Sequence, residues 1–211
     1  NMSKTAVALQ ILKSRKFFYD FDNRRNLIPL LFIGEWDKAT NALVWPEAYD
    51  FKSNKWLPGT KPSQYYVYEE VYKKLLVVSR DPITDIITIS FTHASPHVSK
   101  KIVDWLVKDL NTQLKNDDLY EAEKSLEYLY LELDTTSSND VRSLIFSMIQ
   151  SKLQVKTLAN SRKDYRFKIL DPAIAPDMKH SPVRSFICIA ITLIGFFFSI
   201  IISLIYHYIY I

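Results

Sequence analysis

Two histidines are the first residues whose spacing could do chemistry. His93 and His97 lie four positions apart, a separation that brings two side chains to one face of a helix, where they could share a metal ion. Ser95 and Pro96 stand between them, and a serine followed by a proline is typical of the point where a helix begins. His93 would then precede the helix and His97 would lie inside it. The sequence therefore predicts no metal site.

The other side chains that could take part in catalysis do not form the pattern of a catalytic site. Cys188, the single cysteine, lies in an apolar run without a charged neighbour that would stabilise a thiolate. The chain has three glycines, too scattered for a phosphate-binding loop. Four glutamates flank an apolar helical pattern, which favours a solvated helix face over paired acids; they are Glu121, Glu123, Glu127 and Glu132. We expect no enzyme activity, no cofactor and no metal.

Aromatic residues and charge bear on the class of partner. The net charge is +4 and no run of five basic residues occurs, so we expect no nucleic acid. Trp36, Trp45 and Trp56 lie in a region without clear periodicity, residues 23–61. They have two interpretations: their rings could stack on sugars, or they could anchor loops and contacts between subunits.

The hydrophobic spacing indicates the elements that position these residues. It predicts a helix from about Lys4 to Asp22 and a second, short helix that opens at Pro62 and Ser63. Residues 75–79 and 86–92 are typical of strands, and the turn residues 81–85 between them predict a half-buried hairpin. A last strand is predicted over Arg166–Leu170. We expect an α+β fold.

A long helical hairpin is predicted at about residues 96–162. Its first helix carries an apolar seam with alternating spacings of three and four, which needs a helical partner; the seam residues are Leu119, Ala122, Leu126, Leu129 and Leu133. A capping box of Ser137 and Asp140 is expected to open the second helix. Its predicted apolar stripe comprises Val141, Leu144, Ile145, Met148, Val155 and Leu158. The seam is interpreted as the internal contact of the hairpin, with packing between subunits as the alternative.

The C-terminal end predicts membrane attachment. Residues 185–211 contain no Asp, Glu, Lys or Arg, and roughly 20 apolar residues suffice to cross a bilayer as a helix. We divide the chain into a domain of residues 1–170, a proline-rich linker of residues 171–184, a transmembrane helix of residues 185–206 and a short tail of residues 207–211. The linker prolines, Pro172, Pro176 and Pro182, act either as a stiff tether or, with Arg184 and Gly195, as a contact for a membrane partner.

Several of these motifs together resemble a known family. One motif is Arg80-Asp81-Pro82-x-Thr84-Asp85, which Ser95-Pro96 follows. Another is Asp171-Pro172-Ala173-x-x-Pro176, with Pro182-x-Arg184 ahead of the apolar run. Together these motifs are similar to those of the Wzz-type polysaccharide co-polymerases, the O-antigen chain length determinant proteins. Ala122-x-x-Ser125-x-x-Tyr128-Leu129 and Leu158-Ala159-Asn160 add to the likeness, which extends from about Ala6 to the end of the chain.

The resemblance implies a fold and a set of partners. The fold would be a membrane-proximal α/β base with a long helical extension, and the final helix would be a membrane span. Identical subunits would form a homo-oligomeric ring in the cell inner membrane with the large domain in the periplasm. The ring would work with the O-antigen polymerase on polysaccharide linked to undecaprenyl diphosphate, without catalysis of its own. The family's N-terminal transmembrane segment has no counterpart in this sequence, so we expect a fragment or a shortened architecture.

Two rival functions remain open at this stage. One is a related co-polymerase for another glycan, enterobacterial common antigen or capsule. The other is a tail-anchored cytoplasmic interaction protein, since Lys179 and Arg184 precede the apolar run and no basic residue follows it.

Overall fold

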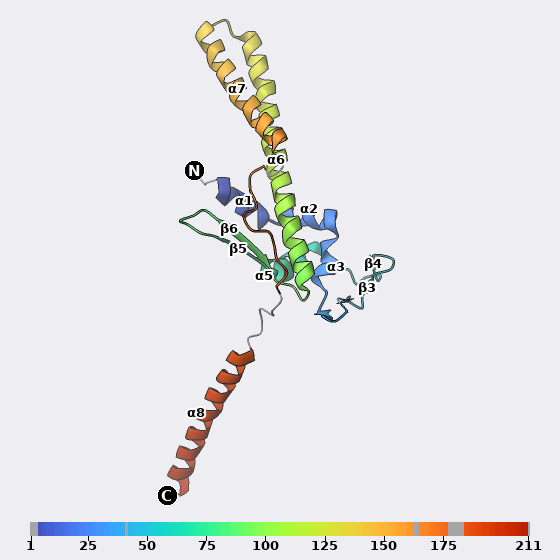
Figure 1. Cartoon of the computed structure of the whole chain (residues 1–211), viewed down its shortest axis with the longest axis vertical. Coiled ribbons are helices and arrows are strands. Elements are labelled where there is room, and N and C mark those ends of the chain that lie inside the picture. The colour runs from blue at the N-terminus through green and yellow to red at the C-terminus, as the bar shows by residue number, and fades with distance from the viewer. Residues whose placement is uncertain (1–3, 41, 163–164, 177–183, 211) are drawn as a thin grey trace. The chain divides into compact units, whose positions relative to one another are not determined.

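The computed structural model describes residues 4–40, 42–162, 165–176 and 184–210, with backbone alone at residues 184–187, 190 and 203–210 (Figure 1). The chain divides into two units, Asn1–Ala175 and Pro176–Ile211, which are treated separately below. The first unit combines helices with three small antiparallel hairpins, so the predicted α+β class is confirmed in this coarse sense.

The N-terminal helix is broken at Ser14. Helix α1 covers Lys4–Leu12 and α2 covers Arg15–Arg25, so the prediction of one helix to Asp22 is wrong. The Ser14 hydroxyl accepts a hydrogen bond from the Phe17 N–H at 3.1 Å, which caps α2. The hydrophobic spacing conceals this break because Leu12 and Phe17, on either side of it, are buried in the same core.

Residues 26–61 fold into one short helix and two small hairpins. Asn26 has a φ of 49° and begins the turn into α3, Leu27–Leu31. Strand β1, Glu35–Trp36, pairs with β2, Leu43–Val44, and β3, Tyr49–Asp50, pairs with β4, Lys55–Trp56. In each hairpin turn an aspartate accepts hydrogen bonds from a hydroxyl, Thr40 or Ser53, and from a backbone amide, which hold the pKa values of Asp37 and Asp50 below their usual range.

A helical segment and the predicted strand hairpin complete the base. α4, Gln64–Tyr66, continues into the π-helix η1, Val67–Tyr72, and α5, Lys73–Leu75. Strands β5, Leu76–Arg80, and β6, Ile87–Phe91, pair in antiparallel register, which confirms the predicted hairpin within about one residue at each end. The Tyr72 side chain is buried beside Phe18, and this burial raises the pKa of its hydroxyl well above the usual value.

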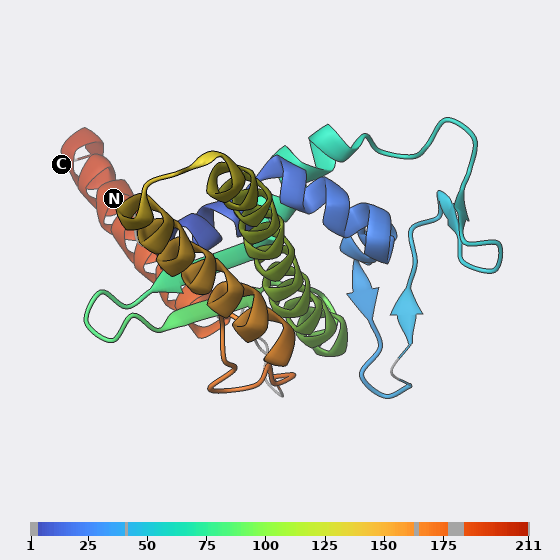
Figure 2. The ribbon, with the colours of Figure 1, turned by 90° about the horizontal axis from the view of Figure 1, so that it is seen from above.

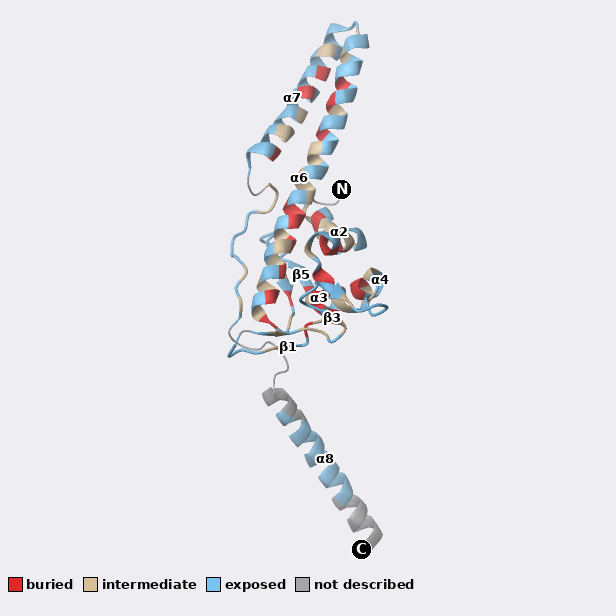
Figure 3. Cartoon of the chain, turned by 90° about the vertical axis from the view of Figure 1, so that its right-hand side faces the viewer, coloured by how far each residue is buried: buried red, intermediate tan, exposed pale blue. Residues whose placement is uncertain are grey.

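The longest helix of the described residues links this base to the helical hairpin. α6 covers Pro96–Thr135, and the Ser95 side chain caps it as predicted. Its first half is buried in the main core through Val98, Ile102, Leu106 and Leu110, and its second half packs against α7, Asn139–Ser161 (Figure 3). Seen from above, α6 and α7 lie side by side (Figure 2).

The predicted capping box at the hairpin turn is wrong. The N-cap of α7 is Ser138, one residue after Ser137, and its side chain makes no capping hydrogen bond. The turn is held from the other side, because the Arg142 guanidinium donates to the carbonyl oxygens of Leu133 and Thr136 at the end of α6, at 2.8 and 3.2 Å.

The strand predicted over Arg166–Leu170 is also wrong. None of its described residues pairs as a strand, and the backbone bends at Arg166 and Leu170. Its backbone groups find their partner in a side chain, since Asn111 of α6 accepts from the N–H groups of Arg166 and Phe167 and donates to the Phe167 carbonyl oxygen. The predicted strand is therefore replaced by a segment whose backbone hydrogen bonds are made to one side chain of α6.

The second unit contains helix α8, Arg184–Tyr210. The helix continues through Tyr210, so it includes most of the residues that the sequence assigned to a separate tail. Over the described residues, no helix combines the length and apolar character that crossing a membrane requires. The transmembrane assignment of residues 185–206 stays a prediction.

The main core supplies the first test of this fold. Ile102 is fully buried in the main core, whereas Ile83 in the β5–β6 turn is 92% exposed. Ile102→Ala should lower the free energy of unfolding by about 2–5 kcal/mol, because it leaves a cavity in packed surroundings. Ile83→Ala deletes the same side-chain atoms at an exposed position and should change the free energy of unfolding by less than about 0.5 kcal/mol. Urea unfolding followed by tryptophan fluorescence measures both, and equal effects would contradict the core assignment.

Candidate functional site

The helical hairpin carries the seam that the sequence singled out. Leu126 and Leu129 of α6 pack against Ile145 and Ile149 of α7, with Leu133 at the edge of this cluster. Ala122 is buried and Leu119 is half-buried. The structure thus places the seam at the contact between α6 and α7 of one chain.

The apolar stripe predicted on α7 is confirmed at Ile145, which is buried, and is wrong at Val141, Leu144 and Met148. Ile145, Ile149 and Ala159 are the buried positions of α7. Val141, Leu144 and Met148, which the sequence assigned to the contact, are 43%, 61% and 46% exposed. The seam of α6 is narrow, whereas the apolar face of α7 is wide. The seam therefore covers only one side of that face, and Val141, Leu144 and Met148 have no cover within the described chain.

A second apolar stripe lies on the outer side of α6. Tyr120, Tyr128 and Leu131 are 66%, 65% and 63% exposed. Their positions differ by eight and three residues, which puts them on one helix face, and that face is distinct from the seam of Leu126 and Leu129. The hairpin therefore presents two apolar stripes, the α6 stripe and the α7 stripe, defined as Val141, Leu144 and Met148.

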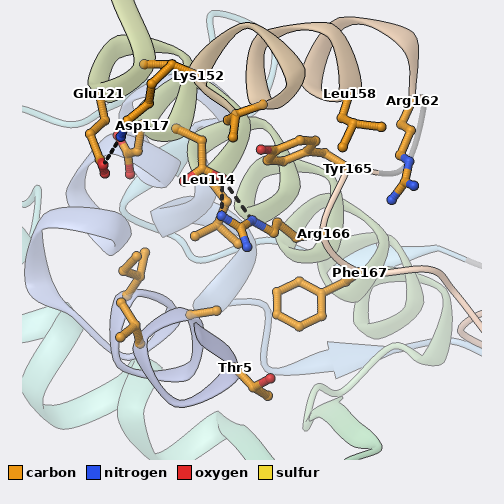
Figure 4. A pocket seen from close by; sticks show the side chains of 16 residues that line it. Thr5, Leu114, Asp117, Glu121, Lys152, Leu158, Arg162, Tyr165, Arg166 and Phe167 are labelled. Carbon is orange, nitrogen blue, oxygen red and sulfur yellow. Dashed lines mark hydrogen bonds and ion pairs between the residues drawn. The ribbon is translucent and has the colours of Figure 1, made fainter. Parts of the chain in front are cut away.

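A cavity of about 750 Å³ opens at the root of the hairpin (Figure 4). It lies between α1, the middle of α6, the end of α7 and the returning segment 165–167. Aliphatic side chains such as Val7, Leu114 and Leu158 line it together with eight polar side chains; these are Thr5, Asp117, Asp118, Glu121, Lys152, Arg162, Tyr165 and Arg166.

Most of the charged side chains in this cavity form ion pairs with one another. The Arg166 guanidinium binds the Asp118 carboxylate from two nitrogens, with Nε at 2.9 Å from Oδ2, and Lys152 Nζ lies 3.3 Å from Glu121 Oε1. Burial and the Asp118 carboxylate raise the pKa of the Tyr165 hydroxyl. These pairs join α6 to α7 and to the returning segment, so the cavity walls act as a brace between hairpin and base.

The three tryptophans singled out in the sequence pack on other aromatic rings, and Trp45 and Trp56 both meet Tyr49. The Trp36 ring meets the edge of His97 with centroids 5.9 Å apart. Trp56 packs against Phe32 and Tyr49, and its indole Nε1 is buried without a hydrogen-bond partner. Trp45 stacks on Tyr49 and Phe51.

The two histidines have separate structural surroundings. His93 Nδ1 accepts from the Ser95 N–H at 3.0 Å, so Nε2 carries the proton that is donated to the Leu30 carbonyl oxygen at 2.8 Å. His97 packs on Trp36 instead. Within the described part of the chain, no group of three or more His, Cys, Asp or Glu gathers as a metal site would need.

The C-terminal candidates are only partly described. Pro172 and Pro176 are exposed, and no neighbouring atom lies within 4 Å of a Cβ built on Gly195. Pro182 and the side chain of Arg184 lie outside the described residues.

Asn111, Asp118 and Arg166 are the positioning residues that sequence reasoning missed. Asn111 is buried on α6, but its neighbours Lys108, Asp109, Thr112 and Gln113 are polar too, so the sequence carries no signal that marks it out. Its backbone partners lie more than fifty residues away, and no spacing rule predicts such a contact.

Comparison with known proteins gives no match to any protein-family model and none to the curated proteins. The assignment of a function therefore depends on the residues and geometry described above.

The Asn111 contact yields a test of the brace. Asn111→Leu keeps the number and branching of the side-chain heavy atoms but removes all three hydrogen bonds, so the 165–167 segment should detach and the free energy of unfolding should fall by about 1–3 kcal/mol. Hydrogen exchange at the amides of Arg166 and Phe167 should accelerate at the same time. The control is Asn116→Leu on the exposed side of α6, and unchanged exchange in Asn111→Leu would refute the contact.

Proposed function

We propose that this chain is a non-enzymatic regulator of O-antigen chain length, a co-polymerase that acts as a homo-oligomer in the cell inner membrane. The observation that carries the proposal is the helical hairpin with two uncovered apolar stripes, held by α6 above an α+β base. The order of the motifs quoted from the sequence agrees with this architecture.

The two stripes support assembly from identical subunits. They lie on different helices, so the α6 stripe of one copy and the α7 stripe of the next can pair head to tail. A heterologous contact of this kind forms a ring when the rotation closes. Tyrosine, leucine and methionine are side chains that protein interfaces favour over charged ones.

The membrane part of the proposal is supported by the sequence. Residues 185–211 carry no charged side chain, and Tyr206, Tyr208 and Tyr210 gather at their end, as aromatic residues do at a membrane–water interface. The large domain would be periplasmic, and the partners would be the O-antigen polymerase and the polysaccharide on undecaprenyl diphosphate. A co-polymerase for enterobacterial common antigen or capsule is the alternative within the same class.

The hairpin stripes predict the effect of a charge on assembly. Leu131→Glu and Leu144→Glu each place a carboxylate where an apolar contact is proposed, and burying a side chain of this size contributes about 1.5–3 kcal/mol. Each variant should therefore weaken association at least about tenfold. The mass of the full chain in detergent, by light scattering, measures this. Ser143→Glu, on an exposed face of α7 that points at least about 100° away from Val141, Leu144 and Met148, is the control and should leave the mass unchanged.

The function itself predicts a change in lipopolysaccharide. Cells that lack the gene should show O-antigen without a preferred length, and restoring the chain should bring back a modal cluster on a gel. Restoration with Leu131→Glu should fail, and restoration with Ser143→Glu should succeed. A ladder that is identical in all four strains would contradict a role in O-antigen length.

A further inference from the structure

Large apolar side chains are exposed on the segment that carries strands β2 to β4. Val44, Phe51 and Leu57 are 52%, 61% and 49% exposed. Trp45 extends this group, since its ring stacks on Phe51 with centroids 4.8 Å apart. Four large apolar residues within one short, exposed segment indicate contact with an apolar surface outside the chain.

This segment is fixed to the base. Tyr49 is buried, and its ring lies against Trp56 with centroids 5.2 Å apart. Trp56 in turn meets the edge of Phe32 from the end of α3, at 6.1 Å. The Asn26 side-chain amide donates to the Tyr49 hydroxyl at 3.2 Å. The exposed residues are thus presented by a packed aromatic group instead of a loose loop.

The place of the segment in the first unit suggests what the surface is. The chain leaves this unit at Ala175, at the end away from the α6–α7 turn, and the hairpins β1–β2 and β3–β4 lie toward that same end (Figures 1 and 3). Residues 176–183, which precede α8, can span at most roughly 30 Å even when fully extended. If α8 crosses a bilayer, this end of the base must stay within that reach of the lipid headgroups.

The residue types of the segment fit a lipid headgroup region. Tryptophan and tyrosine favour the membrane–water interface, and Phe51 and Leu57 can bury apolar area just below it. Lys52, Lys55 and Lys61 outnumber Glu47 and Asp50 between residues 43 and 61, which favours anionic lipid.

We infer that the β2–β4 segment is a second membrane contact, in which Trp45, Phe51 and Leu57 insert into the headgroup region of the bilayer that holds α8. The inference rests on the membrane span of the proposed function. A base held at two points has a fixed tilt on the membrane. Every hairpin of an assembly would then stand at the same angle.

Fluorescent labels on single cysteines in the full chain test the inference. The native Cys188 reports on α8, and Cys188→Ser combined with Phe51→Cys reports on the segment. Tyr128→Cys, also with Cys188→Ser, is the matched control, because Tyr128 is an aromatic residue of α6 that is as exposed as Phe51. Each labelled chain is reconstituted into phosphatidylcholine–phosphatidylglycerol vesicles with or without lipid that carries a nitroxide at carbon 5 of its acyl chain.

The inference expects the label at position 51 to lose about half or more of its fluorescence in nitroxide vesicles, as a group at interface depth would. The label at position 128 should lose almost none. If the label at Cys188 is quenched and the label at position 51 behaves like that at 128, the second contact is overturned while the span stands. If the chains do not float with the vesicles and Cys188 is not quenched, the span is wrong and the inference falls with it.

Discussion

The continuity of α6 is the constraint on which the first unit depends. At 1.5 Å per residue its 40 residues extend about 60 Å. Ile102 and Leu106 fix its first half in the aromatic core of α2 and η1, and Leu126 and Leu129 fix its second half to α7. One uninterrupted helix belongs to both clusters, so the orientation of the hairpin follows the orientation of α6 in the base. The position of the hairpin is therefore set by the packing of the base.

The returning segment after α7 depends on α6 in the same way. Asn111 satisfies its backbone, and the Asp118–Arg166 pair fixes it one or two turns further along the helix. A carboxylate and a guanidinium that are both about three-quarters buried, with two hydrogen bonds between them, hold geometry better than an exposed pair does. The segment therefore needs no neighbouring strand. Side chains of α6 hold it on its way to Ala175, where the chain leaves the first unit.

Large apolar side chains are exposed in two places on the first unit. The α6 and α7 stripes are exposed on the hairpin, and Phe51 and Leu57 are exposed toward the opposite end of the base. A ring of copies would cover the first group and a lipid surface would cover the second. Both surfaces belong to elements that are rigidly packed on the side facing the core, so neither needs to fold upon contact.

The sequence alone determined the elements whose signals are local. Ser95 and Pro96 specify the start of α6 because a side-chain cap and a fixed φ act within one turn. Alternation over residues 86–92 specified β6, and the seam spacing specified a helical partner, since both patterns follow from the repeat of a single element. The uncharged residues 185–211 likewise predict membrane attachment from composition alone.

Only the tertiary structure decided which apolar face each element buries and where extended backbone finds its partners. Leu144 and Ile145 are equivalent in type, yet one is exposed and the other buried, because the narrow seam of α6 selects between them. Arg166–Leu170 alternates like a strand, but its partner is Asn111, more than fifty residues earlier in the chain. Both results depend on how whole helices pack against each other. That packing is decided by many contacts between residues far apart in the sequence, which no local pattern of residues encodes.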